Sequence, residues 1–173
     1  YSVTITDDSS CIFIASVQTL EPTALTATAD SVNVTCNGDA NGTTTVFPNG
    51  GSAPYSFLWD AAANNQTSQT ATGLSGGIYS VTVTDDSSCV FITSVQIIEP
   101  TALTATTDSV NLTCNGDADG IAAVFPGGGT FPYSYLWNTI PPQTSSTVTG
   151  LSGGIYSVTI TDDSSCIFIA SVQ

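Results

Sequence analysis

The sequence contains no lysine, arginine or histidine, while its 14 acidic residues give a net charge of −14. Nucleic acids and anionic membrane surfaces are bound mainly through lysine and arginine, so we expect neither as a partner. The sequence also has no apolar run long enough for a transmembrane helix, so we expect no membrane insertion. The acidic surface should attract cations instead.

The missing histidine and lysine also remove the usual bases of nucleophilic catalysis. A serine or cysteine nucleophile needs such a base beside it, and a phosphate-binding loop of the common type needs a lysine. Carboxylates could serve in acid/base catalysis, but the pairs Asp7-Asp8, Asp85-Asp86 and Asp162-Asp163 fall in repeated polar turns. We therefore predict that the protein is not an enzyme.

The sequence does contain a tandem repeat. Residues 1–18 recur unchanged as residues 156–173, and a close variant occupies residues 79–96, so the period is about 78 residues. Glu21-Pro22 and Glu99-Pro100 mark the borders and should be short extended connectors. We predict that residues 1–22 are the C-terminal strands of a preceding repeat, 23–100 a complete repeat and 101–173 a second repeat. Alternatively, residues 1–22 could be strands donated to a neighbouring molecule.

Apolar and polar residues alternate with a period of two, which is typical of half-buried strands. Hydrophobic residues make up 41% of the chain, enough for a core. Each repeat should contain six or seven short strands, a number that indicates an all-β fold of tandem immunoglobulin-like β-sandwich modules. Within 23–100, the expected strands are Leu25–Val34, Thr43–Phe47, Tyr55–Trp59, Thr67–Thr72, Ile78–Thr84 and Val90–Ile98.

Five cysteines recur in phase, two in each repeat and one in the N-terminal segment. A small domain gains most from an internal cross-link, which favours the pairs Cys36–Cys89 and Cys114–Cys166, with Cys11 bonded to the preceding repeat. Two alternatives remain open: bonds between neighbours, Cys11–Cys36 and Cys89–Cys114, or free buried thiols.

Two loops resemble the first half of a calcium-binding loop, because oxygen-bearing side chains alternate before a glycine. The glutamate that completes an EF-hand loop is missing, and a simple turn capped by its own Asx side chains is the competing interpretation. The candidate ligands are Asn37, Asp39 and Asn41 in one loop and Asn115, Asp117 and Asp119 in the other. We expect no cofactor other than calcium.

The order of motifs resembles the SprB repeat. These motifs are Cys-Asn-Gly-Asp-x-x-Gly at 36–42, Gly-Gly-x-x-Pro-Tyr-Ser-x-Leu-Trp at 50–59, Thr-Gly-Leu-Ser-Gly-Gly-Ile-Tyr at 72–79, Ser-Cys at 88–89 and Glu-Pro at 99–100. All but Glu-Pro recur from Cys114 onward. The resemblance implies a large surface protein of Bacteroidota, in a family where some members are adhesins of gliding motility. It also implies O-glycosylation at Ser31 and Ser109, which match the signal Asp-Ser-apolar.

From this resemblance we expect a structural, non-catalytic segment of an extracellular cell-surface filament or adhesin stalk, with neighbouring copies of the repeat as partners. The alternative is an adhesive module that binds a carbohydrate or surface polymer, with calcium as a candidate cofactor. The exposure of Trp59 and Trp137 should separate the two, because solvent-facing tryptophans can stack on sugars whereas buried ones belong to a core.

Overall fold

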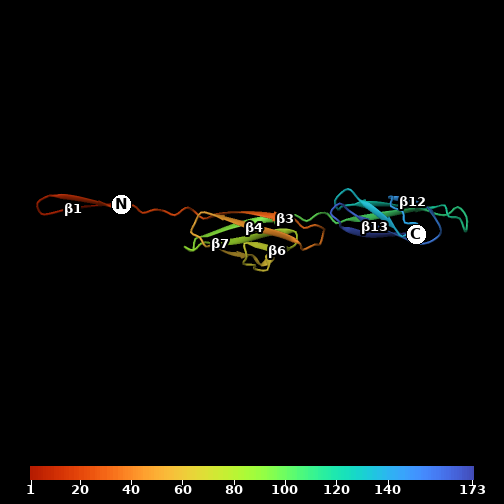
Figure 1. Cartoon of the computed structure of the whole chain (residues 1–173), viewed down its shortest axis with the longest axis horizontal. Helices are drawn as coiled ribbons and strands as arrows, with labels where there is room; N and C mark the ends of the chain where they lie inside the picture. The colour runs from red at the N-terminus through yellow and green to blue at the C-terminus, as the bar shows by residue number, and fades with distance from the viewer.

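The computed structural model describes all residues from 1 to 173 and consists almost entirely of antiparallel strands. Three units lie in a row along one long axis: an N-terminal hairpin, a first β-sandwich and a second β-sandwich (Figure 1). The predicted all-β fold is therefore confirmed. The only helical element is the three-residue turn η1 (Ala61–Ala63), and no helix is long enough to cross a membrane.

Each sandwich contains two three-stranded sheets. The first sandwich joins β3 (Thr26–Val32), β4 (Gly42–Asn49) and β6 (Thr70–Leu74) in one sheet, and β5 (Ser56–Trp59), β7 (Gly77–Thr84) and β8 (Val90–Ile97) in the other. The second joins β9 (Thr104–Val110), β10 (Gly120–Gly127) and β12 (Thr147–Leu151), and β11 (Ser134–Trp137), β13 (Tyr156–Thr161) and β14 (Ile167–Val172).

The connectivity of each sandwich is immunoglobulin-like. The first strand pairs with the second and the second with the fourth, while the fifth strand pairs with both the third and the sixth. This is the A-B-E and C-F-G pairing of immunoglobulin domains, without a D strand. The Tyr79 hydroxyl donates to the Ser75 carbonyl at 2.9 Å and the Tyr156 hydroxyl to that of Ser152 at 3.0 Å. The predicted immunoglobulin-like sandwich and its tyrosine corner are confirmed.

The alternating apolar residues form one core in each sandwich. Trp59 is 0% exposed and packs with the fully buried Val81 and Val83, and Trp137 is 1% exposed beside Val158 and Ile160. The indole nitrogen of each tryptophan donates at 2.9 Å to a backbone carbonyl, that of Ser68 or Ser145. The tryptophans are therefore core residues whose single polar atom is satisfied.

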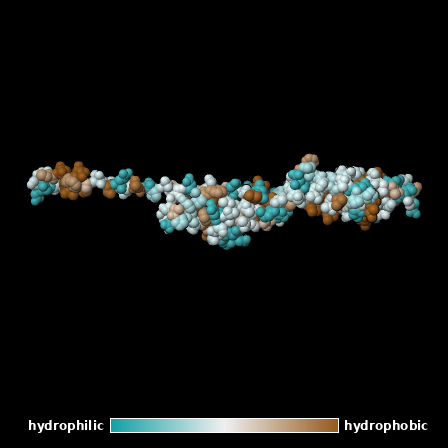
Figure 2. All heavy atoms as spheres, in the orientation of Figure 1, coloured by the Kyte–Doolittle hydropathy of each residue, from teal (hydrophilic) through white to brown (hydrophobic).

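The N-terminal hairpin pairs β1 (Ser2–Thr6) with β2 (Ile12–Ser16) in the register of β13 and β14. Ile5 lies opposite Phe13, just as Ile160 lies opposite Phe168. Ile160 is fully buried, whereas Ile5 is 56% exposed, and the hairpin forms a hydrophobic patch apart from both sandwiches (Figure 2). The same sequence thus forms a core face in one place and an isolated hairpin in the other. Its assignment to a preceding repeat stays a prediction.

Candidate functional site at the module junction

The two cysteine-bearing segments of a sandwich lie at its opposite ends. Cys89 directly precedes β8, while the loop that contains Cys36 lies where β8 finishes, since the Ile98 N–H donates to the Asn33 side chain at 2.8 Å. An eight-residue strand is roughly 26 Å long, whereas disulfide-bonded residues have Cα atoms about 4.4–6.8 Å apart. The predicted pair Cys36–Cys89 is therefore wrong, and so is Cys114–Cys166.

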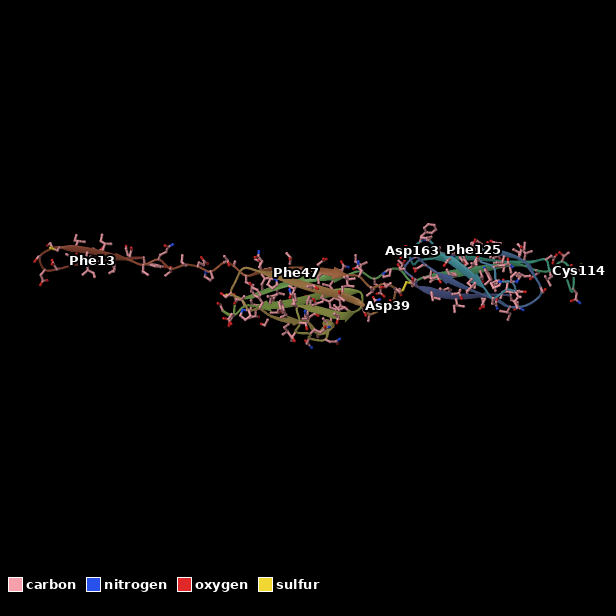
Figure 3. The ribbon with its side chains drawn as sticks, in the orientation of Figure 1. Phe13, Asp39, Phe47, Cys114, Phe125 and Asp163 are labelled. Carbon is pink, nitrogen blue, oxygen red and sulfur yellow. A yellow bond between two sulfur atoms is a disulfide. The ribbon has the colours of Figure 1, made fainter.

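Cys36 is instead bonded to Cys166, across the junction between the two sandwiches. Their Cα atoms are 5.7 Å apart although the residues are 130 positions apart in sequence. The bond is visible between the two sandwiches in Figure 3. Cys11, Cys89 and Cys114 are free and exposed, so the alternative bonds between neighbours do not form either. A bond from Cys11 to a residue outside this chain stays a prediction.

The Glu-Pro connector is also attached to the Cys36 loop. The Gly38 N–H donates to Glu99 Oε1 at 2.6 Å, and the Asn37 side-chain amide donates to the Pro100 carbonyl at 3.1 Å. Gly76 lies against the same connector, because a Cβ atom at this glycine would lie 2.5 Å from the Glu99 Cβ. The connector is thus held by side-chain and backbone contacts that the sequence motif alone did not reveal.

The candidate metal ligands of the first loop are engaged with their own loop or with the connector. Asp39 Oδ2 accepts from the Cys36 N–H and from the Asn41 amide, both at 3.2 Å, while Asn41 Oδ1 accepts from the Thr35 N–H at 3.0 Å. Asn37 points to the connector. These contacts are those of an Asx-capped turn.

The second loop is built alike, and its candidate ligands are Asn115, Asp117 and Asp119. The Thr113 side-chain hydroxyl and backbone N–H donate to Asp119, and these hydrogen bonds lower the pKa of its carboxyl group. The Asp117 N–H donates to the Cys114 carbonyl at 3.2 Å. Nowhere in the chain do three or more histidine, cysteine, aspartate or glutamate side chains form a group that could hold a metal ion. The calcium hypothesis stays a prediction.

The turn that carries Cys166 is organised by a buried aspartate. Asp162 is 5% exposed and accepts from the Cys166 N–H and the Thr130 N–H, both at 2.8 Å. Asp85 occupies the same place in the first sandwich, where it accepts from Cys89 at 2.8 Å and Ser52 at 2.9 Å. The hydrogen bond from the Ser52 N–H is the main cause that lowers the pKa of Asp85, and burial opposes it.

The remaining candidate residues lie away from the junction. The Ser31 hydroxyl donates to the Gln96 carbonyl at 2.9 Å, and the Ser109 hydroxyl donates to that of Gln173 at 2.7 Å, so each links the two sheets of its sandwich. A glycan on either oxygen would remove that donor; O-glycosylation at these serines stays a prediction. Trp59 and Trp137 are buried and cannot stack on a sugar.

A known family model matches the first half of each sandwich. The family model described as SprB repeat matches residues 28–64 and 106–141. The SprB repeat model thus matches the chain at two places, once in each sandwich. SprB repeats occur in cell-surface proteins, and this repeat with its immunoglobulin-like fold is typical of non-enzymatic structural modules. Each matched segment includes a cysteine loop, so Cys36 and Cys114 are parts of the repeat itself.

The full length of the chain has no close match among known proteins. No curated protein matches the chain. A solved structure described as "Structural basis for Dscam isoform specificity" is 12% identical, with a TM-score of 0.35. The similarity covers 94% of this chain and 50% of the Dscam chain, so this chain spans half of that length. At this TM-score the similarity carries no argument, and the fold assignment rests on the strand pairing above.

Proposed function

We propose that the chain is a non-catalytic structural segment of an extracellular cell-surface filament or adhesin stalk, whose consecutive SprB repeats are fixed end to end. The observation that carries this proposal is the disulfide between Cys36 and Cys166, since it joins two modules rather than the two sheets of one module. Disulfides persist mainly in oxidising compartments, which supports a location outside the cytoplasm.

The contacts around that bond support the same role. The Glu99 carboxylate and the Pro100 carbonyl accept hydrogen bonds from the loop that holds Cys36, so the connector has little freedom of its own. A covalent bond and a held connector at one junction keep neighbouring modules in a fixed order and spacing. The high negative charge, −14, should keep such an extended chain soluble.

The alternative function, a module that binds carbohydrate or a surface polymer, has no contact in its favour. Both tryptophans that could stack on a sugar are buried, and their indole nitrogens are bonded to backbone carbonyls. We therefore keep the structural function as the conclusion.

Immunolabelling of the cells that produce the protein tests the location. Antibodies raised against the folded chain should label intact cells, and proteinase K added outside should remove the label. A label that appears only after permeabilisation would reject the surface proposal. An antibody against a cytoplasmic protein of the same cells is the control for intactness.

A further inference from the structure

We propose that the bond between Cys36 and Cys166 is repeated at every junction of the SprB array, so that Cys114 and Cys89 are the junction cysteines for a following and a preceding repeat. This inference rests on the proposed structural function and specifies its covalent pattern. In this pattern, the cysteine after the first strand of one repeat bonds to the cysteine before the last strand of the next.

The Cys114 loop shares its backbone turn with the Cys36 loop. The Asp117 N–H donates to the Cys114 carbonyl at 3.2 Å, as the Asp39 N–H donates to that of Cys36 at 3.1 Å. Gly116 and Gly38 both adopt positive φ, 97° and 86°. Cys114 lies at the end of the second sandwich that is far from the observed bond, exposed to solvent (Figure 3). It therefore presents to a following repeat the geometry that Cys36 presents to Cys166.

The Cys89 turn in turn reproduces the Cys166 turn. The Asp85 N–H donates to the Cys89 carbonyl and the Asp162 N–H to the Cys166 carbonyl, both at 3.0 Å. Ser88 and Ser165, which precede the two cysteines, both have φ of 66°. The turn lies at the N-terminal end of the first sandwich. The Asp86 N–H donates to the Ser52 carbonyl, and the N–H of the neighbouring Gly51 donates to the carbonyl of Thr23, which precedes the first strand β3.

The partner is thereby defined chemically as another copy of this repeat. At the observed junction, the Cys36 loop has three partners. Cys36 is bonded to the sulfur of Cys166, and the loop donates hydrogen bonds to the Glu99 carboxylate and the Pro100 carbonyl of the connector. The Cys114 loop offers the matching Gly116 N–H and Asn115 side chain. A repeat that enters through Glu-Pro and carries the turn Asp-Asp-Ser-Ser-Cys supplies all three partners.

The same pattern accounts for Cys11. The Asp7 N–H donates to the Cys11 carbonyl at 3.0 Å and Ser10 has φ of 65°, so this residue lies in the same type of turn as Cys89 and Cys166. The hairpin would be the end of one repeat, and Cys11 would bond to the loop cysteine of the repeat before that one. Cys11 would not bond to a cysteine of its own repeat.

Bond formation requires an oxidant, and a small-molecule or protein disulfide supplies it by exchange. With oxidised glutathione, the Cys114 thiolate attacks one glutathione sulfur and releases the first glutathione thiolate. The thiolate of the partner cysteine then attacks the Cys114 sulfur and releases the second. Two protein thiols are oxidised to one disulfide, two protons leave them, and one glutathione disulfide is reduced to two glutathione molecules.

An extended chain tests the inference directly. Because Gln96 and Gln173 end the same motif, residues 97–173 appended after Gln173 continue the repeat in phase and give a third sandwich. In variants of this chain, all cysteines but two are replaced by serine. One variant keeps Cys114 and the appended copy of Cys166, a second keeps Cys36 and Cys166, and a third keeps Cys114 and Cys166 of the same sandwich.

In a glutathione redox buffer, the first two variants should each lose two hydrogen atoms by intact mass, nearly to completion, whereas the third should stay reduced. Circular dichroism and buried-tryptophan fluorescence verify folding in each variant. The inference is overturned if the first variant stays reduced while the second is oxidised, or if the third is oxidised in the folded state. If the second also stays reduced, the junction bond itself is rejected, and the inference with it.

The outcomes separate this inference from the proposed function. Intact cells that are labelled by antibody, together with a reduced first variant, reject the repeated bond and leave the surface segment standing. An oxidised first variant together with unlabelled intact cells leaves the covalent pattern standing and rejects the surface location.

Discussion

The Glu99 carboxylate accepts a hydrogen bond of 2.6 Å from the backbone N–H of Gly38, so the connector between the sandwiches is attached to the loop that carries the junction cysteine. Glu21 has the same place in the repeat, but it lies in the exposed stretch after the N-terminal hairpin and takes part in no such bond. The two glutamates therefore form a matched pair for experiments on the connector.

Replacement of Glu99 by alanine should expose the Gly38 N–H. A hydrogen bond to a charged group at this exposed position is worth about 1 kcal/mol, so the Gly38 amide should exchange with solvent roughly fivefold faster. Hydrogen exchange followed by NMR measures this rate. Glu21→Ala is the control and should leave it unchanged; equal effects of the two substitutions would contradict a specific contact.

Substitution of Gly76 by alanine should force the connector away from the first sandwich. The new Cβ would lie 2.5 Å from the Glu99 Cβ, whereas at the equivalent Gly153 the nearest atom, Leu112 Cδ1, is at 3.5 Å. Such overpacking costs about 1–3 kcal/mol, so Gly76→Ala should lower the free energy of unfolding by that amount more than Gly153→Ala. Urea denaturation of both variants checks this, and identical midpoints would reject the contact.

The pH dependence of stability should depend on Asp85. Hydrogen bonds from Ser52, Cys89 and Ser87 hold its pKa below the ordinary value, so the native state favours the ionised carboxylate. A carboxyl group with a lowered native pKa stabilises the fold above its unfolded pKa of about 4, and this contribution is lost as the pH falls through the native value.

Asp85→Asn should therefore lower the free energy of unfolding at neutral pH. It should also make the decrease of that free energy below about pH 4 less steep. Urea denaturation across this pH range measures the slope. Asp86→Asn, at the exposed neighbouring position, should keep the slope of the unsubstituted protein. A slope that Asp85→Asn leaves unaltered would show that this carboxylate is not a source of the acid sensitivity.

Replacement of Trp59 by phenylalanine should destabilise the first sandwich selectively. The substitution removes the N–H that satisfies the Ser68 carbonyl and leaves space in a fully buried site, at a cost of about 2–4 kcal/mol. Circular dichroism should then show an earlier first transition in urea. The fluorescence of Trp137 should report the usual midpoint for the second sandwich, and a common shift of both transitions would contradict independent cores.

The sequence predicted the parts of the fold that depend on local pattern. The alternation around Val81 and Val83 predicted a strand with one buried face, and the aromatic residue Trp59 at that phase predicted a core position. The Glu-Pro pair predicted a connector, but not its hydrogen bonds, since these depend on which end of the sandwich the Cys36 loop occupies.

The cysteine pairing could not be predicted, because it depends on the direction of β8 rather than on spacing. Cys36 and Cys89 recur in phase, yet β8 separates them, and the partner of Cys36 is 130 positions away. The role of Asp85 was missed for a related reason. Asp85 and Asp86 are adjacent aspartates that the sequence alone does not distinguish. Only the hydrogen-bond register of the turn decides that Asp85 is buried and Asp86 exposed.

The bond between Cys36 and Cys166 also limits how far the protein can be stretched. A backbone of 130 residues reaches about 450 Å when fully extended, whereas the bond holds its two ends at a Cα separation of 5.7 Å. A pulling force applied outside this segment passes through the sulfur atoms and bypasses most of both sandwiches. A module can then unfold under tension while the chain between the two cysteines stays unextended. Reduction of this one disulfide would allow that whole segment to extend.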